Sequence, residues 1–86
     1  SVNLPNVSAA RTGACRICVI HRNIPTMLSQ VTAAITEAGV NIDNLINKSK
    51  KDYAYTIADC DAVVGKETED SIAAIDGVIK VRTIRQ

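Results

Sequence analysis

Residues 25–42, PTMLSQVTAAITEAGVNI, decide the fold because they hold a complete helix and the first residues of the strand that follows it. Apolar side chains recur there at the i, i+3, i+4 and i+7 spacing that gathers them into one stripe of a helix. Those side chains are Met27, Leu28, Val31, Ala34, Ile35 and Ala38. Pro25 suits the first turn of a helix, and Gly39 suits the residue that ends one. The segment therefore predicts a helix with one buried face.

The segments on either side of this helix alternate between strand and helix patterns. Apolar and β-branched side chains predict strands over residues 15–21, 40–48, 53–60 and 78–85. A second helix is predicted over residues 65–76, because acidic side chains occupy its first turns and Gly77 follows its last. The order is therefore β-α-β-β-α-β, which is typical of the ferredoxin-like α+β fold. In that fold both helices cover one face of a four-stranded antiparallel sheet.

The strand patterns also predict which side chains face the helices. In the third strand larger side chains alternate with small ones, and the small ones indicate the face that the helices approach. The larger set is Tyr53, Tyr55 and Ile57, and the small set is Ala54, Thr56 and Ala58. In the last strand Ile79 and Val81 are expected to face the core, with Lys80 and Arg82 facing away. In the second strand the alternation slips at Leu45-Ile46, which predicts a bulge there.

Length and charge limit the class of protein. A chain of 86 residues supports one domain, predicted over residues 14–86, with residues 1–13 forming an arm or the end of a linker. The formal net charge is +1, and Tyr53 and Tyr55 are the only aromatic side chains, so a nucleic-acid partner is not expected. No apolar run approaches the ~20 residues that span a membrane, so no membrane association is expected either.

The cysteines predict free thiols. Cys15, Cys18 and Cys60 are an odd number, which does not suit a set of disulfides and favours the reducing cytoplasm. Cys15 and Cys18 have the C-x-x-C spacing of metal and redox sites. However, they fall within a predicted strand, where residues three apart point to opposite faces. We therefore expect no metal site; a metal-handling domain of the same fold is the alternative, and it requires these two thiols to share a metal.

The sequence contains no residues in a known catalytic spacing, so the chain is not expected to be an enzyme by itself. The single histidine, His21, has no serine or cysteine partner at a motif spacing, and no glycine-rich phosphate loop is present. The acidic residues within 67–70 are interpreted as a solvated helix start, and the basic residues within 48–51 as a solvated hairpin turn.

Three polar residues remain, and they flank the first helix on both sides. His21 and Asn23 precede it, and Asn41 follows Gly39. Singly, such residues more often cap a helix or form a turn. Together they form a candidate binding site, because exposed peptide N–H groups at a helix start bind carboxylates and an Asn side chain both donates and accepts hydrogen bonds. An amino acid, with its carboxylate and ammonium groups, matches this set.

These residues carry a resemblance to a known family. The matching segments are SVNLP at 1–5, HRNIP at 21–25 with Leu28, EAGVNI at 37–42, DGV at 76–78 and KVR at 80–82. With these segments the sequence resembles an ACT domain, and within that family the C-terminal regulatory domains of D-3-phosphoglycerate dehydrogenases. The resemblance extends over nearly the whole chain.

The resemblance implies a regulatory function. Two copies would pair side by side into an eight-stranded sheet, and L-serine or another small amino acid would bind at the seam as a feedback inhibitor of serine biosynthesis. The chain itself would need no cofactor, whereas another domain of the longer enzyme, an oxidoreductase, would bind NAD. The implied ligand-binding residues are His21, Asn23, Pro25, Thr26, Asn41 and Ile42, with Asn41 supplied by the second copy.

The sequence departs from the family at Thr26, where the family usually has glycine directly after the loop proline. Glycine lets a ligand approach the backbone closely, whereas Thr26 adds a methyl group and a hydroxyl group. Two hypotheses therefore stand. One is a serine-binding regulatory domain, and the other is a dimerisation domain whose ligand site is lost or altered.

Overall fold

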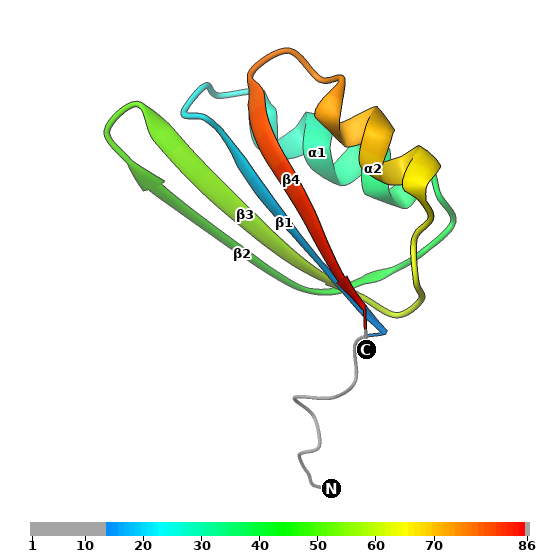
Figure 1. The fold of residues 1–86 in the computed structure, drawn as a ribbon. Helices are drawn as coiled ribbons and strands as arrows, with labels where there is room; N and C mark the ends of the chain where they lie inside the picture. Colours follow the sequence, from blue (N-terminus) through cyan, green and yellow to red (C-terminus); the bar gives the residue numbers. More distant parts are fainter. Residues whose placement is uncertain (1–13, 86) are drawn as a thin grey trace, which may run out of the picture.

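The computed structural model describes residues 14–85, so the predicted arm at residues 1–13 lies outside the described part. Four strands and two helices follow one another in the predicted order (Figure 1). They are β1 Cys15–Arg22, α1 Met27–Thr36, β2 Ile42–Lys50, β3 Tyr53–Cys60, α2 Lys66–Ala73 and β4 Val78–Arg85. The strands pair antiparallel in the order β2-β3-β1-β4, and both helices lie on one face of the sheet. The predicted ferredoxin-like fold is confirmed.

The core lies between the two helices and the inner strands of the sheet. Alternate side chains of β1 and β3 point toward the helices, and the small side chains predicted for that face of β3 are buried. The buried residues that pack together are Cys15, Ile17, Val19, Val31, Ile35, Val40, Ala58, Cys60, Val64 and Ile72. Full burial of one isoleucine of this set, such as Ile35, contributes about 1.5–3 kcal/mol to stability. The predicted apolar stripe of α1 is therefore what attaches that helix to the sheet.

Two glycines lie where the backbone needs a positive φ. Gly39 (φ 83°) connects α1 to β2, and Gly77 (φ 102°) connects α2 to β4. The helix predicted to continue to Ala38 ends earlier, at Thr36, because the residues before Gly39 form a turn in which the Gly39 N–H donates to the Thr36 carbonyl oxygen (3.0 Å). The second helix likewise ends at Ala73, before the predicted limit.

In the described part of the chain, neither helix is long and apolar enough to cross a membrane.

Strand β2 forms one edge of the sheet, and the helices leave it uncovered. Ile42 is half-buried, and every later residue of the strand is exposed. The prediction of a bulge at Leu45-Ile46 is wrong, because the irregularity lies between Ile42 and Asn44, and the pairing with β3 is regular from Asn44 onward. Neither face of β2 is buried within one chain, so burial does not require polar and apolar residues to alternate along it. The break in alternation at Leu45-Ile46 therefore does not mark a bulge.

The prediction that Ile79 faces the core is also wrong. The pairing of β1 with β4 shifts register at His21, which lies opposite Val78, so Ile79 has no opposite residue. Val78 takes the inward position and packs against the core, whereas Ile79 is 53% exposed. Val81 packs against the core as predicted. A bulge adds one residue to a strand, and the sequence alternation alone does not reveal which residue is extra.

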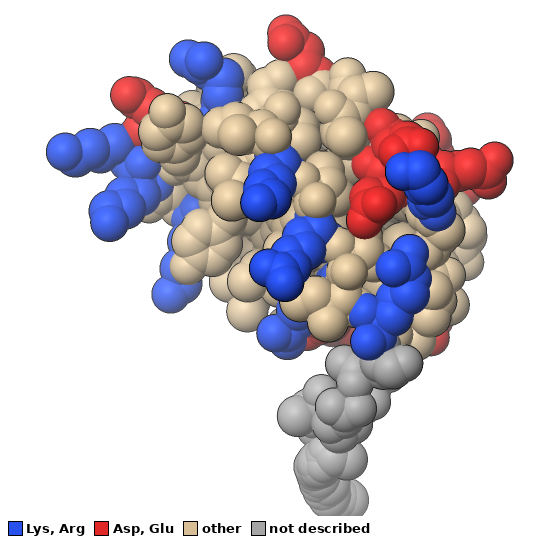
Figure 2. Space-filling view, in the orientation of Figure 1, with Lys and Arg blue, Asp and Glu red and all other residues tan. Residues whose placement is uncertain are grey.

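The face of the sheet away from the helices carries basic side chains around an apolar centre. Lys80 and Arg82 are exposed on this face as predicted, and together with Cys18, Ile20 and Ile84 they line a shallow hollow. Arg16 forms an ion pair with Asp59 (Nε to Oδ1, 2.7 Å), and the hydrogen bond from Arg16 lowers the pKa of the Asp59 carboxyl. Figure 2 shows Lys and Arg side chains spread over the sheet and acidic side chains gathered over α2. The net charge of +1 therefore conceals a separation of charge between the two layers.

Gly77→Ala is expected to destabilise the fold by more than the matched control Gly39→Ala. Both substitutions place a side chain at a positive φ, which costs about 1–2 kcal/mol. At Gly77 the new Cβ would also lie 2.8 Å from Sδ of Met27, whereas nothing lies within 4 Å at Gly39. The Met27 side chain must therefore move, at a further cost of about 1 kcal/mol. Urea unfolding followed by circular dichroism measures both losses, and equal losses would contradict this account.

Candidate functional site

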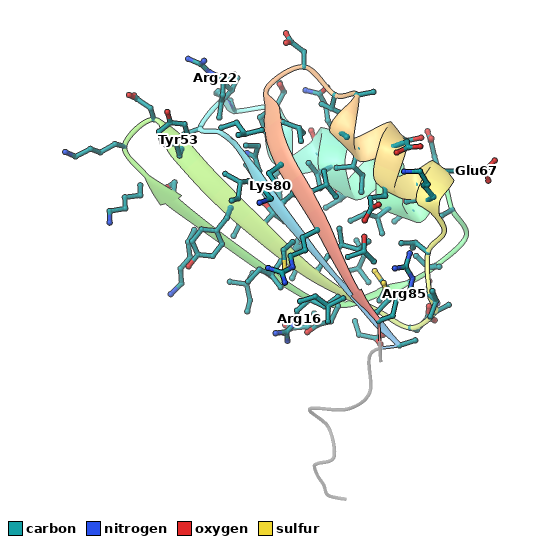
Figure 3. All side chains as sticks on the ribbon, viewed as in Figure 1. Arg16, Arg22, Tyr53, Glu67, Lys80 and Arg85 are labelled. Atoms are coloured by element: carbon teal, nitrogen blue, oxygen red, sulfur yellow. The ribbon has the colours of Figure 1, made fainter. Side chains whose placement is uncertain are left out.

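Asn23 ties the connection between β1 and α1 to the turn between β2 and β3. Its backbone N–H donates to the Asp52 carbonyl oxygen (2.8 Å), and its side-chain Nδ2 donates to the Lys51 carbonyl oxygen (3.0 Å). Lys51 has a φ of 58°, so Asn23 supports a turn residue in the left-handed region. Figure 3 labels Arg22 and Tyr53, which lie opposite each other in β1 and β3 at this end of the sheet.

At the start of α1 the N–H groups of Leu28 and Ser29 have no hydrogen-bond partner within residues 14–85, whereas the Met27 N–H donates to the Ile24 carbonyl oxygen (3.1 Å). Thr26 is the N-cap residue, so Asn23 does not cap the helix, and the Thr26 side chain makes no capping hydrogen bond. Its Oγ1 instead accepts from Gln30 Nε2 (3.1 Å). The first turn contains no acidic residue, so the positive end of the helix dipole is not neutralised by the helix itself. Pro25 and Thr26 are both exposed, and together with these N–H groups they suit a carboxylate.

His21 lies in the core and takes part in a network that the sequence did not reveal. Its Nδ1 lies 2.9 Å from the Arg22 carbonyl oxygen, and its Nε2 lies 2.9 Å from Thr56 Oγ1. Asn47 Nδ2 donates to the same Thr56 oxygen (2.9 Å). A carbonyl oxygen only accepts, so the network assigns the imidazole proton to Nδ1 and makes the Thr56 hydroxyl the donor to Nε2. Direct contact between His21 and a ligand therefore requires the ring to exchange one of these bonds.

Asn41 is held by Asp61, which the sequence analysis missed. The Asn41 backbone N–H donates to Asp61 Oδ1 (2.9 Å), and Asn41 Nδ2 donates to Asp61 Oδ2 (3.0 Å). In return the Asp61 N–H donates to the Asn41 carbonyl oxygen (3.0 Å). Ile42, the next residue, pairs with Cys60 at the start of the β2–β3 ladder. The sequence did offer a signal for Asp61. It is an acidic residue directly after β3, the strand that pairs with β2, and Asn41 directly precedes β2.

The structure brings the predicted ligand-binding residues together in two groups. His21, Asn23, Pro25 and Thr26 lie where β1 leads into α1, beside the β2–β3 turn. Asn41 and Ile42 lie at the other end of β2, where α1 leads into that strand (Figure 1). The two groups lie at opposite ends of β2, whose nine residues span about 30 Å. One copy of the chain therefore does not enclose a small ligand with both groups.

The two cysteines of the C-x-x-C pair lie on opposite faces of β1. Cys15 is buried on the helix side of β1, whereas Cys18 lies on the other face and is half-buried, as predicted. Residues 14–85 contain no group of three or more side chains able to hold a metal ion. Burial, with smaller contributions from Cys15 and three nearby aspartates, raises the pKa of the Cys60 thiol to about 11. Cys60 is therefore protonated and unreactive at neutral pH.

The layer arrangement, the strand order and the two polar junctions around α1 define the class: the chain has the fold of an ACT domain. It is similar to the crystal structure of the ACT domain from GTP pyrophosphokinase of Chlorobium tepidum, with a TM-score of 0.66, 18% identity and coverage of 81% of this chain and 95% of that one. A structure of an unknown protein from Galdieria sulphuraria gives a TM-score of 0.71 at 14% identity, over 86% of this chain and 44% of that one. No protein-family model matches the sequence.

Among curated proteins, the chain is similar to D-3-phosphoglycerate dehydrogenases. It is 30% identical to the enzyme of Escherichia coli strain K12 and 29% identical to that of Dictyostelium discoideum, each over 98% of this chain. The chain spans 21% and 20% of the length of these relatives. The resemblance inferred from the sequence motifs is thus confirmed. It concerns a region that makes up about one fifth of the length of each matching enzyme.

Thr56→Val is expected to lower the free energy of unfolding by about 1–3 kcal/mol, because it leaves Nε2 of buried His21 without its partner and removes the oxygen that accepts from Asn47 Nδ2. Valine keeps the shape of threonine, so the loss reports the hydroxyl. Thr36→Val is the matched control, since the Thr36 hydroxyl bonds only to a carbonyl oxygen of its own exposed helix turn, and a change within about 0.5 kcal/mol is expected. Chemical denaturation measures both, and a neutral Thr56→Val would show that the network does not stabilise the fold.

Thiol labelling at pH 8 is expected to modify Cys18 well before Cys15 and Cys60. A pKa of about 11 leaves about one Cys60 thiol in a thousand as the reactive thiolate at that pH, and burial limits access further. Mass spectrometry of the labelled chain identifies the site. In denaturant all three cysteines should react at similar rates, which is the control. Rapid labelling of Cys60 in the folded chain would contradict the assignment.

Proposed function

We propose that this chain is a regulatory domain that binds L-serine or another small amino acid between two copies of itself. In this proposal it is the ACT domain, residues 14–86, of a longer NAD-dependent D-3-phosphoglycerate dehydrogenase, and serine acts as a feedback inhibitor. The observation that carries the proposal is the uncovered edge strand β2, which has predicted ligand-binding residues at each of its ends. The three free cysteines suit a cytoplasmic location.

Pairing along β2 would join the two halves. An exposed strand edge presents unpaired N–H and C=O groups that pair readily with another strand. If two β2 strands pair antiparallel about Ile46, the middle residue of the strand, Asn41 of one copy comes to lie opposite Lys51 of the other. The Lys51 carbonyl oxygen is the one that Asn23 binds. The twofold symmetry would thus form two sites, each with Asn23 from one copy and Asn41 from the other.

The chemistry of the combined site suits an amino acid. The free N–H groups at the start of α1 suit the carboxylate, and the side-chain oxygens of Asn23 and Asn41 suit the ammonium group. His21, two residues before Asn23, orders the end of β1 through its bonds to Arg22 and Thr56. With about seven non-hydrogen atoms, serine at ~1.5 kcal/mol per atom binds with at most about 10 kcal/mol, so micromolar to millimolar affinity is expected.

Binding across the seam would couple the ligand to the assembly. A ligand that contacts both copies stabilises the paired state in which both halves of the site are present. In a longer enzyme, pairing that restrains the catalytic domains would lower turnover, which is a coupling between two distinct sites. The Thr26 side chain, which stands exposed at the start of α1, is the specific feature that favours the second hypothesis, a dimerisation domain with an altered site.

Complementation between two variants tests the shared site. Asn23→Ala and Asn41→Ala are each expected to abolish binding of L-serine in titration calorimetry. In a mixed dimer both substitutions fall in one site, and the other site keeps both asparagines. Mixing the two variants should therefore restore about one quarter of the wild-type sites, the statistical share of intact sites. Ser71→Ala, an exposed polar residue on α2 away from β2, is the control and should bind as the wild type does.

The outcomes separate the hypotheses. A dimer in light scattering that gives no heat with any small amino acid at millimolar concentration would support the dimerisation domain and remove the regulatory site. Binding by wild type without recovery on mixing would place the site within one copy. A monomeric chain would contradict pairing along β2.

A further inference from the structure

We propose that Asp61 is a further residue of the ligand site, where it positions Asn41 and supplies the negative charge that attracts the ammonium group of the ligand. The inference rests on the proposed amino-acid site between two copies of the chain. It adds the residue that selects the ligand: through Asp61 the site discriminates against analogues that lack the ammonium group.

The first argument is the way Asp61 holds Asn41. Both carboxylate oxygens of Asp61 accept hydrogen bonds from Asn41, one from the backbone N–H (2.9 Å) and one from Nδ2 (3.0 Å). The Asp61 N–H completes the ring by donating to the Asn41 carbonyl oxygen (3.0 Å). Because Nδ2 is held against Asp61, the amide plane is fixed with Oδ1 on its opposite side. Asn41 is exposed, and its Oδ1 accepts no hydrogen bond from residues 14–85.

The second argument is the charge at this end of the sheet. Within residues 14–85 the ion pairs are Arg16 with Asp59 and Lys66 with Asp70, so Asp61 has no basic partner there. Asp43 lies nearby on β2, and its charge acts together with those of Asp59 and Asp61 to disfavour ionisation of buried Cys60. An ammonium group that reached Asn41 Oδ1 would therefore approach Asp43 and Asp61, neither of which forms an ion pair within residues 14–85.

The third argument is the opposite polarity of the other half of the site. The start of α1 has free N–H groups and no acidic residue in its first turn. In the proposed pairing this positive end would face Asp61 of the second copy. A zwitterion would then bridge the two copies, with its carboxylate at the helix of one and its ammonium at Asp61 of the other. Neither copy alone provides both charges at one place.

The test compares two ligands that differ only in the group that Asp61 is proposed to bind. These are L-serine and glycerate, in which a hydroxyl group replaces the ammonium group. Calorimetry on the dimeric wild-type chain should give at least about tenfold tighter binding of serine. Asp61→Asn should weaken serine binding about tenfold or more and glycerate binding clearly less, because the substitution removes the charge that only serine uses and also one of the two acceptors that hold Asn41. A merely structural role would weaken both ligands equally.

Two further variants keep the test decisive. Asp43→Asn removes a neighbouring charge that makes no hydrogen bond to Asn41, and it should change serine affinity by less than about threefold. If Asp61→Asn unfolds in a thermal melt, Asp61→Glu replaces it, because the longer side chain displaces Asn41 but keeps the charge. That variant should bind serine more weakly and still prefer it to glycerate.

The results distinguish this inference from the proposed function. A wild-type chain that binds no small amino acid overturns both. Serine binding by wild type that Asp61→Asn leaves unchanged, or a serine preference that Asp61→Glu abolishes, overturns the role of Asp61 and leaves the shared site standing.

Discussion

The packing of α1 on β1 is the interaction on which the rest of this structure depends. Val31 and Ile35 are fully buried in the same apolar cluster as Ile17 and Val19, which are inward-facing residues of β1. Small side chains on the neighbouring strand β3 let the helix approach. This contact places the start and the end of α1 at opposite ends of the sheet, and it leaves β2 without cover (Figure 1). The position of both halves of the candidate site follows from it.

Two hydrogen-bond networks then give the two ends of β2 different chemistry. At one end Asn23 binds the β2–β3 turn, next to a helix start with free N–H groups. At the other end Asp61 binds Asn41 through both carboxylate oxygens. One end is thus suited to a negative group and the other to a positive group. An edge strand with opposite polarity at its two ends is well matched to antiparallel pairing with its own copy, since each end then meets its complement.

The sequence predicted most of the fold, because α1, β1 and β3 are each buried on one side and their apolar residues therefore recur with a regular spacing. It failed at Ile79 and at the bulge in β2. At both places an extra residue enters a strand, and the sequence alternation does not identify which residue is displaced. For the candidate site the sequence identified His21, Asn23 and Asn41 as a group. It did not reveal that His21 is buried with both ring nitrogens bonded, because its partner Thr56 is thirty-five residues away along the chain.

By itself the sequence determined the order of elements, the buried face of each helix and the polar residues at the ends of α1, because each of these depends on neighbours within a few residues. Only the tertiary structure decided that Asn23 and Asn41 lie at opposite ends of β2 and that Asp61 holds Asn41. Pairing between β2 and β3 brings Asn41 and Asp61 together across twenty residues of chain. Such contacts depend on strand register, and register is a property of the assembled sheet.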